Sequence, residues 1–381
     1  MKVLLVRNAY IQDFGGAERL AANMADELLS QGHEVALVSA QPKLLHYSRA
    51  LGVKAIKGRW WSKQNWSGIR TLLFPAYIAW QGSLYFWYLS LFKKERPQIV
   101  HLISRDDFIA ASWAAANLGI KVFWTDTADL KHVFANLNIW YKNPVGKLVY
   151  QSSTKASAVT LVSESEKRAV QTAVGRTLPD RFKVVHIAGR DTAVKPRERS
   201  KADKQAVIFS TTARLIRTKG LAELIAAFQI IDEPGTDYRL WLVGEGADEH
   251  ELQALADNNP HIVFFGHSDS PLEYVAASDV YVLPSYSEGF SLSLAEAAML
   301  GKPIITTNVG GNPELVNKGN GILVEVKDIP GLAKAMTKLG TDSKLRQKLG
   351  RQARRDYETN FDFSTIIKTK FIPLYEAALK I

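Results

Sequence analysis

Short apolar runs alternate along the chain with longer segments whose apolar residues recur at helical spacing. The first run, 3–6, leads through a glycine-containing turn to a segment from Ala17 whose apolar residues share one helical face: Leu20, Met24, Leu28 and Leu29. A second run, 35–39, follows Gly32, a residue that suits the end of a helix. Apolar runs that alternate with amphipathic helices are typical of parallel sheets covered by helices, so the pattern predicts an α/β fold.

The alternation continues through the rest of the chain. Further apolar runs that predict strands lie at 97–104, 121–126, 206–215, 238–246, 261–266, 280–285 and 303–307. Between 189 and 205 the chain is charged, contains proline and shows no apolar periodicity, as a linker does. Because 381 residues exceed the size of one small core, we expect two Rossmann-like, doubly wound domains, 1–190 and 206–361, joined by a linker over 191–205.

Composition narrows the classes of function. The chain has no cysteine, which excludes disulfides, thiolate metal sites and a cysteine nucleophile. Its net charge of +10 favours an anionic partner, such as a phosphate group or an anionic membrane surface. Neither G-x-G-x-x-G nor a P-loop motif is present, which disfavours NAD and P-loop chemistry, and no nucleic-acid recognition motif is found. The first run is followed by Arg7 and predicts a strand rather than a signal peptide.

One segment, 71–92, carries no charged residue and has the length of a membrane-spanning helix. Pro75, Gln81 and Gly82 interrupt it, so three interpretations stay open: docking at a membrane interface, a buried core helix, or a true span. The segment upstream mixes aromatic and basic residues, a composition typical of membrane interfaces, and it favours docking. The candidate membrane or acceptor residues are Arg59, Trp60, Trp61, Lys63 and Trp66.

Polar residues and glycines cluster at the ends of the predicted strands: Gly15, Gly16, His101, Arg214, Lys219, Gly244 and Glu288. Parallel sheets bind ligands beyond the carboxyl ends of their strands, so we expect a site between the two domains. Two cations after one strand, Arg214 and Lys219, could hold a pyrophosphate. Arg217 is an alternative candidate for this role. The glycine pair opens a helix whose free N–H groups suit an anion.

Simpler interpretations exist for the same residues. Glu296 could be the partner of Ser293 in a helix capping box, and Glu288 could be a solvated loop acid. A pair of carboxylates also suits glycoside hydrolysis. His101 could be structural. Asp126 and Asp129 could line a cleft, while the absence of a metal-ligand pattern predicts that no metal is bound.

Taken together, several segments resemble the GT-B glycosyltransferases, specifically the glycosyl transferases group 1 (family GT4). In the first half they are "FGGAERLAANMADELLSQGHEVALVS", "PQIVHLIS" and "LVSESEK". In the second half they are "ARLIRTKGLAELIAAF", "LVGEG" and the block from "FFGHSDS" to "GGNPELV", in which seven residues separate the two glutamates between "LPS" and "GKP". The resemblance covers essentially the whole chain. It implies two Rossmann-like domains that face across a cleft, with the final segment, 362–381, packing back on the first domain.

The resemblance also implies roles for the site residues. Glu296 would bind the ribose and Glu288 the donor sugar, while Arg214 and Lys219 would hold the diphosphate. His101 would lie beside the reacting carbon. The remaining donor-binding residues implied are Gly15, Gly16, Gly244, Phe265, Gly289, Phe290, Ser291 and Leu292. Many members have a histidine where Asp126 or Thr127 stands here, which bears on the acceptor side.

The function implied is a retaining glycosyl transfer without cofactor or metal. The donor would be a nucleotide-sugar, with UDP favoured and GDP-mannose possible, and the acceptor a lipid-linked glycan of the cell surface. The protein would lie in the cytoplasm, peripheral on the inner face of the membrane. A soluble enzyme with a small sugar acceptor and a non-catalytic nucleotide-sugar-binding protein are the alternatives.

Overall fold

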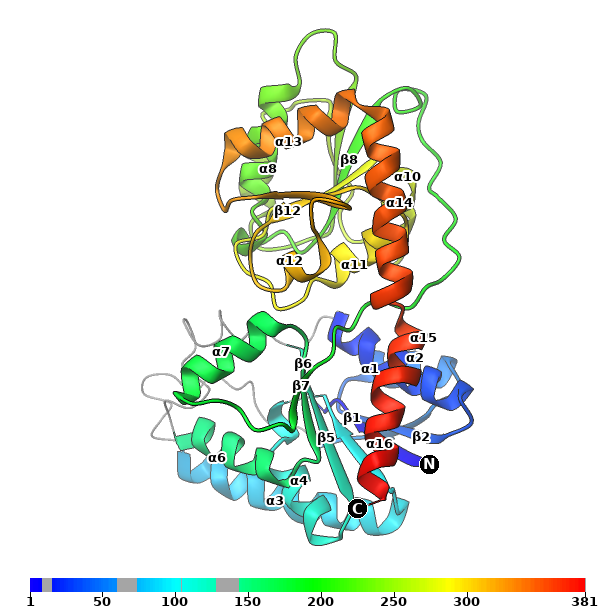
Figure 1. Cartoon of the computed structure of the whole chain (residues 1–381), viewed down its shortest axis with the longest axis vertical. Helices are drawn as coiled ribbons and strands as arrows, with labels where there is room; N and C mark the ends of the chain where they lie inside the picture. The colour runs from blue at the N-terminus through cyan, green and yellow to red at the C-terminus, as the bar shows by residue number, and fades with distance from the viewer. Residues whose placement is uncertain (9–15, 60–73, 104, 128–143, 381) are drawn as a thin grey trace. The chain divides into compact units, whose positions relative to one another are not determined.

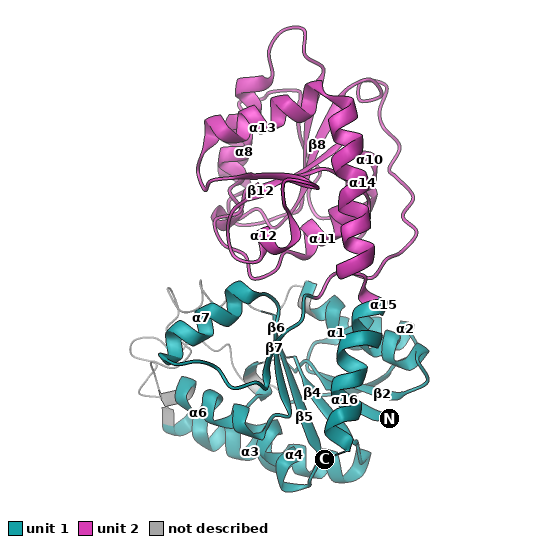
Figure 2. Ribbon diagram, in the orientation of Figure 1, with its two compact units in different colours: residues 1–186, 364–381 teal, residues 187–363 magenta. Residues whose placement is uncertain are grey.

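The computed structural model describes residues 1–8, 16–59, 74–103, 105–127 and 144–380, which form two compact units (Figure 2). Unit 1 comprises Met1–His186 and Ser364–Ile381, and unit 2 comprises Ile187–Phe363. Each unit contains one sheet in which all pairings are parallel, with helices on its faces (Figure 1). This arrangement confirms the predicted α/β fold.

Unit 1 is built on a seven-stranded sheet with the order β3-β2-β1-β4-β5-β6-β7. Its strands are β1 (Lys2–Val6), β2 (Glu34–Ser39), β3 (Lys54–Lys57), β4 (Ile99–Leu102), β5 (Lys121–Asp126), β6 (Ala158–Leu161) and β7 (Phe182–Val184). Its helices are α1 (Gly16–Ser30), α2 (Pro42–Ala50), α3 (Phe74–Glu95), α4 (Ala110–Asn117), α6 (Pro144–Ser152), α7 (Glu164–Val174), α15 (Phe363–Ile366) and α16 (Ile372–Leu379). The strand order reverses between β1 and β4, so polar groups that follow these strands lie at a switch point.

Helix α3 contains most of the uncharged segment. One of its faces is buried in the core of unit 1, through Tyr77, Leu84, Tyr88 and Phe92. Its opposite face exposes Ile78 and Phe86. The described part of the segment is therefore a core helix with an apolar outer face. Across the described residues, no helix combines the length and hydropathy that a membrane crossing requires.

The end of the chain belongs to unit 1. Ser364 Oγ donates to Glu27 in α1 at 2.8 Å, and the Tyr375 hydroxyl of α16 lies 2.5 Å from His101 Nδ1 in β4. Phe371 and Tyr375 are both fully buried. These contacts hold the final helix against the sheet.

Unit 2 is built on a six-stranded sheet with the order β10-β9-β8-β11-β12-β13. Its strands are β8 (Val207–Thr212), β9 (Tyr238–Val243), β10 (Ile262–Phe264), β11 (Val280–Leu283), β12 (Ile304–Thr307) and β13 (Gly321–Val324). Its helices are α8 (Leu221–Ile231), α9 (Glu249–Leu255), α10 (Pro271–Ala277), α11 (Leu292–Met299), α12 (Asn312–Leu315), α13 (Ile329–Thr341) and α14 (Ser343–Asn360). Buried residues of α8 and α13 pack with those of β9, and those of α11 and α14 pack with those of β11.

The segment 191–205, expected to be a linker, has no helix or strand and lies within unit 2. Arg199 donates through Nε to the Ala277 carbonyl at 2.8 Å and through Nη2 to Asp279 at 2.8 Å. The Arg197 amide donates to the Glu273 carbonyl at 3.0 Å. These bonds tie the segment to α10 and the start of β11.

Candidate functional site

In unit 2 the candidate residues follow neighbouring parallel strands. Arg214 comes after β8, Gly244 directly after β9, and Glu288 after β11. Because β9, β8 and β11 are adjacent and parallel, the loops that follow them meet at one edge of the sheet. Lys219 lies in the turn between β8 and α8, at the same edge. The structure thus brings these four residues together.

Lys219 and Glu288 form an ion pair. Lys219 Nζ donates to Glu288 Oε1 at 2.7 Å, and Ser285 Oγ donates to the same oxygen at 2.7 Å. The two charged side chains are 20% and 10% exposed, respectively, which weakens solvent screening of their attraction. Arg214 is exposed and has no hydrogen bond or ion pair with any residue that the structure describes. The edge therefore presents one fixed cation beside one cation that can reorient toward a ligand.

Two glycines with left-handed backbone hold the loops of this ion pair together. A Cβ on Gly220, at φ +67°, would lie 2.0 Å from the Pro284 carbonyl oxygen. A Cβ on Gly310, at φ +53°, would lie 1.6 Å from the Glu288 carbonyl oxygen. Only glycine combines this φ with so close an approach to another backbone. The positions of Lys219 and Glu288 consequently depend on residues that carry no chemistry themselves.

Backbone contacts of the same kind fix the loop that carries Arg214. A Cβ on Gly244 would lie 2.0 Å from the Ala213 carbonyl oxygen, and one on Gly246 would lie 2.2 Å from the Leu215 carbonyl oxygen. The residues on either side of Arg214 are thereby packed against the end of β9. "LVGEG" is thus a sequence signal for close backbone packing, in which Gly244 positions the loop of Arg214.

The second glutamate, Glu296, lies past the first turn of α11. The N-cap of this helix is Ser291, whose hydroxyl accepts from the Leu294 amide, so the capping-box interpretation of Ser293 and Glu296 is wrong. A Cβ on Gly189 would lie 3.4 Å from Glu296 Oε1, which places the carboxylate against the backbone there. Glu296 is therefore not engaged as the helix cap.

The loop between the two glutamates packs against other residues of unit 2. Glu288, Gly289 and Ser291 are buried, and Leu292 opens α11. The Phe290 ring lies 5.7 Å from that of Phe361. This packing presents the N-terminus of α11, with its free N–H groups, beside the ion pair.

Phe265, expected beside a nucleotide base, directly follows β10. Its amide donates to the Leu242 carbonyl at 2.9 Å, which extends the pairing with β9. Its ring contacts Trp241 edge-to-face at 5.4 Å and Tyr274 at 4.8 Å. The side chain therefore belongs to an aromatic cluster on one face of the sheet.

His101 lies inside β4 rather than at a strand end, and its side chain is fully buried. Nδ1 lies 2.5 Å from the Tyr375 hydroxyl and Nε2 lies 2.7 Å from Thr125 Oγ1, so both ring nitrogens are occupied. Burial lowers the pKa of His101 to about 3, which keeps the ring neutral. Both contacts hold the His101 ring inside unit 1, and its expected place beside a reacting carbon stays a prediction.

Unit 1 also buries ion pairs that the sequence did not predict. Asp126, an expected acceptor-side residue, accepts from Arg105 through both carboxylate oxygens at 2.9–3.1 Å. Arg7, after β1, pairs with Glu18 of α1 at 2.8 Å. The sequence signals for this pair were the arginine that follows the first apolar run and the glutamate in the first turn of α1. Gly16 is the first residue of α1, whereas Gly15 lies outside the described residues.

A buried acid lies near the same strand ends. Asp107 is fully buried and accepts from the Tyr88 hydroxyl at 2.5 Å and from the Asn8 amide at 3.3 Å. Burial raises the pKa of the Asp107 carboxyl to about 6, although these hydrogen bonds oppose the shift. Asn8 Nδ2 also donates to the carbonyl of Arg59, whose side chain is exposed. Trp60, Trp61, Lys63 and Trp66 lie outside the described residues.

Within the described residues, no group of three or more His, Asp or Glu side chains is placed to hold a metal ion.

Two family descriptions match the chain in adjacent stretches. Glycosyl transferases group 1 matches residues 193–356, and Glycosyltransferase Family 4 matches residues 14–188. The first match contains Arg214, Lys219 and both glutamates, and the second contains Gly16 and His101.

Several curated relatives share part of the chain. Capsular polysaccharide biosynthesis glycosyltransferase CapM of Staphylococcus aureus is 32% identical over 178 residues, which cover 45% of this chain and 47% of CapM. N-acetyl-alpha-D-glucosaminyl L-malate synthase of Bacillus anthracis is 32% identical over 44% of each chain. The chain thus spans about half the length of these two relatives. An uncharacterized glycosyltransferase of Haemophilus influenzae is 25% identical over 89% of this chain and 91% of its own.

Solved structures share the whole fold at low identity. Anabaena Alr3699/HepE, in complex with UDP and glucose, superposes with a TM-score of 0.76 at 18% identity, covering 98% of this chain and 99% of its own. The lipopolysaccharide outer core galactosyltransferase WaaB superposes with a TM-score of 0.70 at 18% identity, covering 100% and 99%.

Proposed function

The chain is a GT-B glycosyltransferase of the GT4 kind, and from that membership we propose that it is a retaining enzyme that moves a hexose from a nucleoside-diphosphate sugar to an acceptor of cell-surface glycan synthesis. The observation that carries the proposal is the ion pair of Lys219 and Glu288 beside exposed Arg214 at one edge of unit 2. Cations there suit a diphosphate, and a carboxylate suits sugar hydroxyls. Unit 2 would bind the donor and unit 1 the acceptor.

The proposed chemistry follows from where charge develops. The bond between the anomeric carbon and the phosphate oxygen breaks, an acceptor oxygen bonds to that carbon on the same face, and the acceptor proton passes to the departing phosphate. Negative charge grows on the diphosphate, so Arg214, Lys219 and the N-terminus of α11 would stabilise the transition state more than the ground state. In this scheme these groups supply the positive charge without a metal or cofactor.

The nucleotide is proposed to be UDP. Support comes from the structures of Alr3699/HepE, whose complexes contain UDP, UDP with glucose, or UDP-glucose. GDP is the second candidate. One relative, the GDP-mannose-dependent monoacylated alpha-(1-6)-phosphatidylinositol monomannoside mannosyltransferase of Corynebacterium glutamicum, is 27% identical over 55% of this chain.

Calorimetric titration of the full chain with UDP, GDP and ADP tests the donor site. We expect one diphosphate, UDP, to bind at least tenfold more tightly than the others, and Glu296→Ala to weaken its binding about tenfold through loss of a charged hydrogen bond to the ribose. If no diphosphate binds the folded protein, or if Glu296→Ala leaves the affinity unchanged, the assignment of this site fails.

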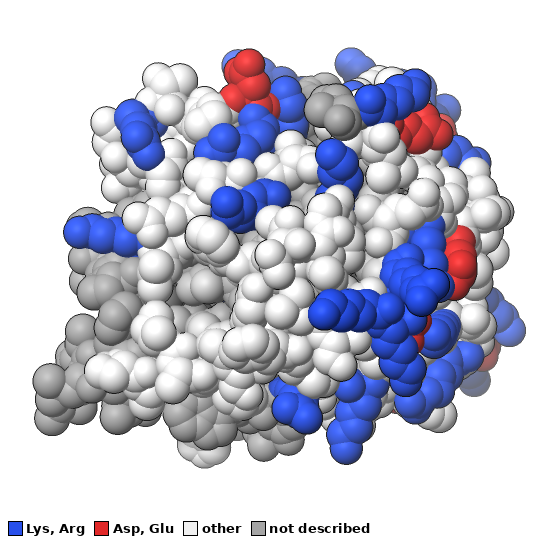
Figure 3. Space-filling model, turned by 90° about the horizontal axis from the view of Figure 1, so that it is seen from below, with Lys and Arg blue, Asp and Glu red and all other residues white. Residues whose placement is uncertain are grey.

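The acceptor is proposed to be lipid-linked, because unit 1 has a net positive charge and exposes large apolar side chains. Unit 1 carries 27 Lys and Arg against 14 Asp and Glu, a net charge of +13, whereas unit 2 carries 21 against 24, a net charge of −3. Figure 3 shows a face on which Lys and Arg are many and Asp and Glu few. In unit 1, Phe86 is 70% exposed and Trp113 is 45% exposed, and Lys93 and Lys94 lie in the last turn of α3. Exposed aromatics with basic residues suit an anionic membrane surface.

Replacing Phe86 with serine is expected to reduce binding to vesicles of phosphatidylglycerol and phosphatidylethanolamine. Burial of one large apolar side chain is worth about 1.5–3 kcal/mol, so the loss should be about tenfold or more. Sedimentation with vesicles measures it, and Ile230→Ser in α8 of unit 2, where the side chain is 53% exposed, is the matched control. Equal binding of wild type and Phe86→Ser would favour the soluble enzyme with a small acceptor.

A further inference from the structure

Tyr286 lies in the loop between β11 and α11, two residues before Glu288. Its amide donates to the Thr218 carbonyl at 2.8 Å. Its hydroxyl donates to the carboxylate of Glu223, in the first turn of α8. Thr218 directly precedes Lys219, and Glu223 follows Lys219 by four residues. One tyrosine therefore binds the chain on both sides of the lysine that is proposed to hold the diphosphate.

The hydroxyl of Tyr286 is bonded to a carboxylate that has few other contacts. Across the residues that the structure describes, Glu223 Oε1 has this hydrogen bond alone, and Oε2 is buried without a partner. Burial, the hydrogen bond to Glu223 and the charge of Glu223 raise the pKa of Tyr286 to about 12. The hydroxyl therefore keeps its proton at neutral pH and donates to a charged oxygen. Such charge-assisted hydrogen bonds are stronger than those between neutral groups.

The ring and the backbone of Tyr286 are held separately from its hydroxyl. Lys327, in the loop after β13, places its ammonium 5.3 Å from the centre of the ring. The bond from the Tyr286 amide to Thr218 does not involve the side chain. Phenylalanine at this position would keep both contacts, so Tyr286→Phe removes only the bond to Glu223.

The ion pair of Lys219 and Glu288 depends on how two loops are placed, because each loop supplies one partner. The turn 217–220 leads into α8, and the loop 284–291 leads into α11. Tyr286 ties the second loop to α8 through Glu223, beyond the turn that carries the lysine. A cation that is fixed before a ligand arrives costs less to order on binding. The tyrosine hydroxyl thus contributes to a preformed phosphate site.

We propose that Tyr286 is a positioning residue of the donor site, whose hydroxyl holds the loop of Glu288 against the turn of Lys219 by bonding to Glu223. This inference rests on the proposed function of that site. It gives Glu223 a part in donor binding that is exerted through Tyr286, without contact to the donor.

Calorimetry with UDP and with uridine on the full chain tests the role of the hydroxyl. In Tyr286→Phe we expect the affinity for UDP to fall about fivefold, because Lys219 is no longer held in place for the phosphates. The affinity for uridine, which has no phosphate, should change less than about twofold. Glu223→Gln should keep the affinity of the wild type for UDP, since its amide oxygen still accepts from the hydroxyl.

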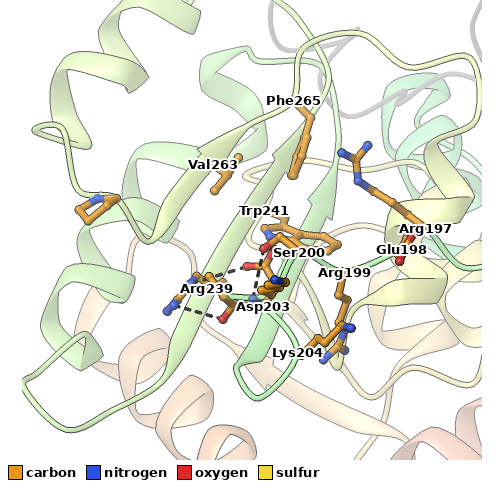
Figure 4. A pocket seen from close by; sticks show the side chains of 13 residues that line it. Arg197, Glu198, Arg199, Ser200, Asp203, Lys204, Arg239, Trp241, Val263 and Phe265 are labelled. Carbon is orange, nitrogen blue, oxygen red and sulfur yellow. Dashed lines mark hydrogen bonds and ion pairs between the residues drawn. The ribbon is translucent and has the colours of Figure 1, made fainter.

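Tyr274→Phe is the matched control, because it removes another hydrogen-bonded tyrosine hydroxyl of unit 2. The Tyr274 hydroxyl accepts from Arg197 at 2.8 Å, and its ring packs with those of Trp241 and Phe265. Arg197 points toward Phe265 there (Figure 4), and its guanidinium lies 4.8 Å from that ring. We expect this control to keep its affinity for UDP within about twofold.

A variant that replaces both partners separates positioning from stability. Tyr286→Phe leaves the Glu223 carboxylate without its partner, which should lower Tm by about 3 °C. Combining Tyr286→Phe with Glu223→Leu removes the carboxylate as well, so Tm should recover. The affinity of the double variant for UDP should stay about fivefold low, because the two loops remain unjoined.

Three outcomes would overturn the inference: equal affinity of wild type and Tyr286→Phe for UDP, an equal loss of affinity for uridine and UDP, or recovery of UDP affinity together with Tm in the double variant. If the wild type itself binds no UDP, the proposed function fails together with this inference. Equal binding of UDP by wild type and Tyr286→Phe removes the inference alone.

Discussion

Replacing Lys219 with alanine is expected to lower turnover of the correct donor and acceptor by about 10²–10³-fold. Lys219 Nζ is held 2.7 Å from Glu288, so the cation is positioned before the donor arrives. Its loss removes charge stabilisation of the leaving diphosphate and leaves the Glu288 carboxylate without its partner at a phosphate site. Affinity should fall more for UDP than for uridine, since in the proposed site only the diphosphate would contact the lysine.

Steady-state kinetics and calorimetry of Lys219→Ala measure these effects, and Arg217→Ala is the matched control. Arg217 is exposed and lies two residues away in the same turn. We expect Arg217→Ala to change turnover less than threefold, about 0.6 kcal/mol. An equal loss of affinity for uridine and UDP in Lys219→Ala, or an equal loss of turnover in both variants, would contradict the phosphate role of Lys219.

Replacing Gly310 with alanine is expected to disable the donor site without removing any charged group. The new Cβ would lie 1.6 Å from the Glu288 carbonyl oxygen, at a backbone φ of +53°. No rotation of a methyl group relieves such a contact, so the loop of Glu288 must move. The free energy of unfolding should fall by about 3 kcal/mol or more, and UDP affinity at least tenfold.

Thermal unfolding and UDP titration of the same sample measure both consequences of Gly310→Ala. Gly301→Ala is the matched control, because Gly301 has a similar φ of +65° but its Cβ would meet its nearest neighbour, the Gly350 carbonyl oxygen, at an ordinary 3.6 Å. The control should lose only about 1 kcal/mol and keep its UDP affinity. If the two variants behave alike, the close approach of Gly310 to Glu288 has no role in positioning the glutamate.

Apolar periodicity predicted the elements of the sheets well where the pattern was strong. The run 121–126 is β5 in the structure, and the run 35–39 is β2 with one added residue, because consecutive buried positions leave little choice of conformation. The helix that contains Glu296 begins at Leu292. Ser291 is the residue that caps it, so the side chain that satisfies the first free amides decided the boundary.

The sequence could not choose between the interpretations of helix α3 and of His101. An uncharged helix has the same composition whether it faces lipid or a protein core, and only the packing of residues such as Tyr88 in unit 1 shows which faces are buried. Similarly, a histidine in "PQIVH" can end a strand or lie within it. The Tyr375 hydroxyl that occupies its ring lies 274 residues away in the sequence.

The sequence by itself determined the order of strands and helices, the division of charge between the two halves, and the residue types that follow the strands of unit 2. Those properties depend on local periodicity and composition, which a short window of sequence contains. Tertiary structure alone decided that Lys219 pairs with Glu288 across 69 residues and that Gly310 touches the backbone of Glu288. Such contacts depend on where parallel strands place their loops in space, and no local pattern specifies that placement.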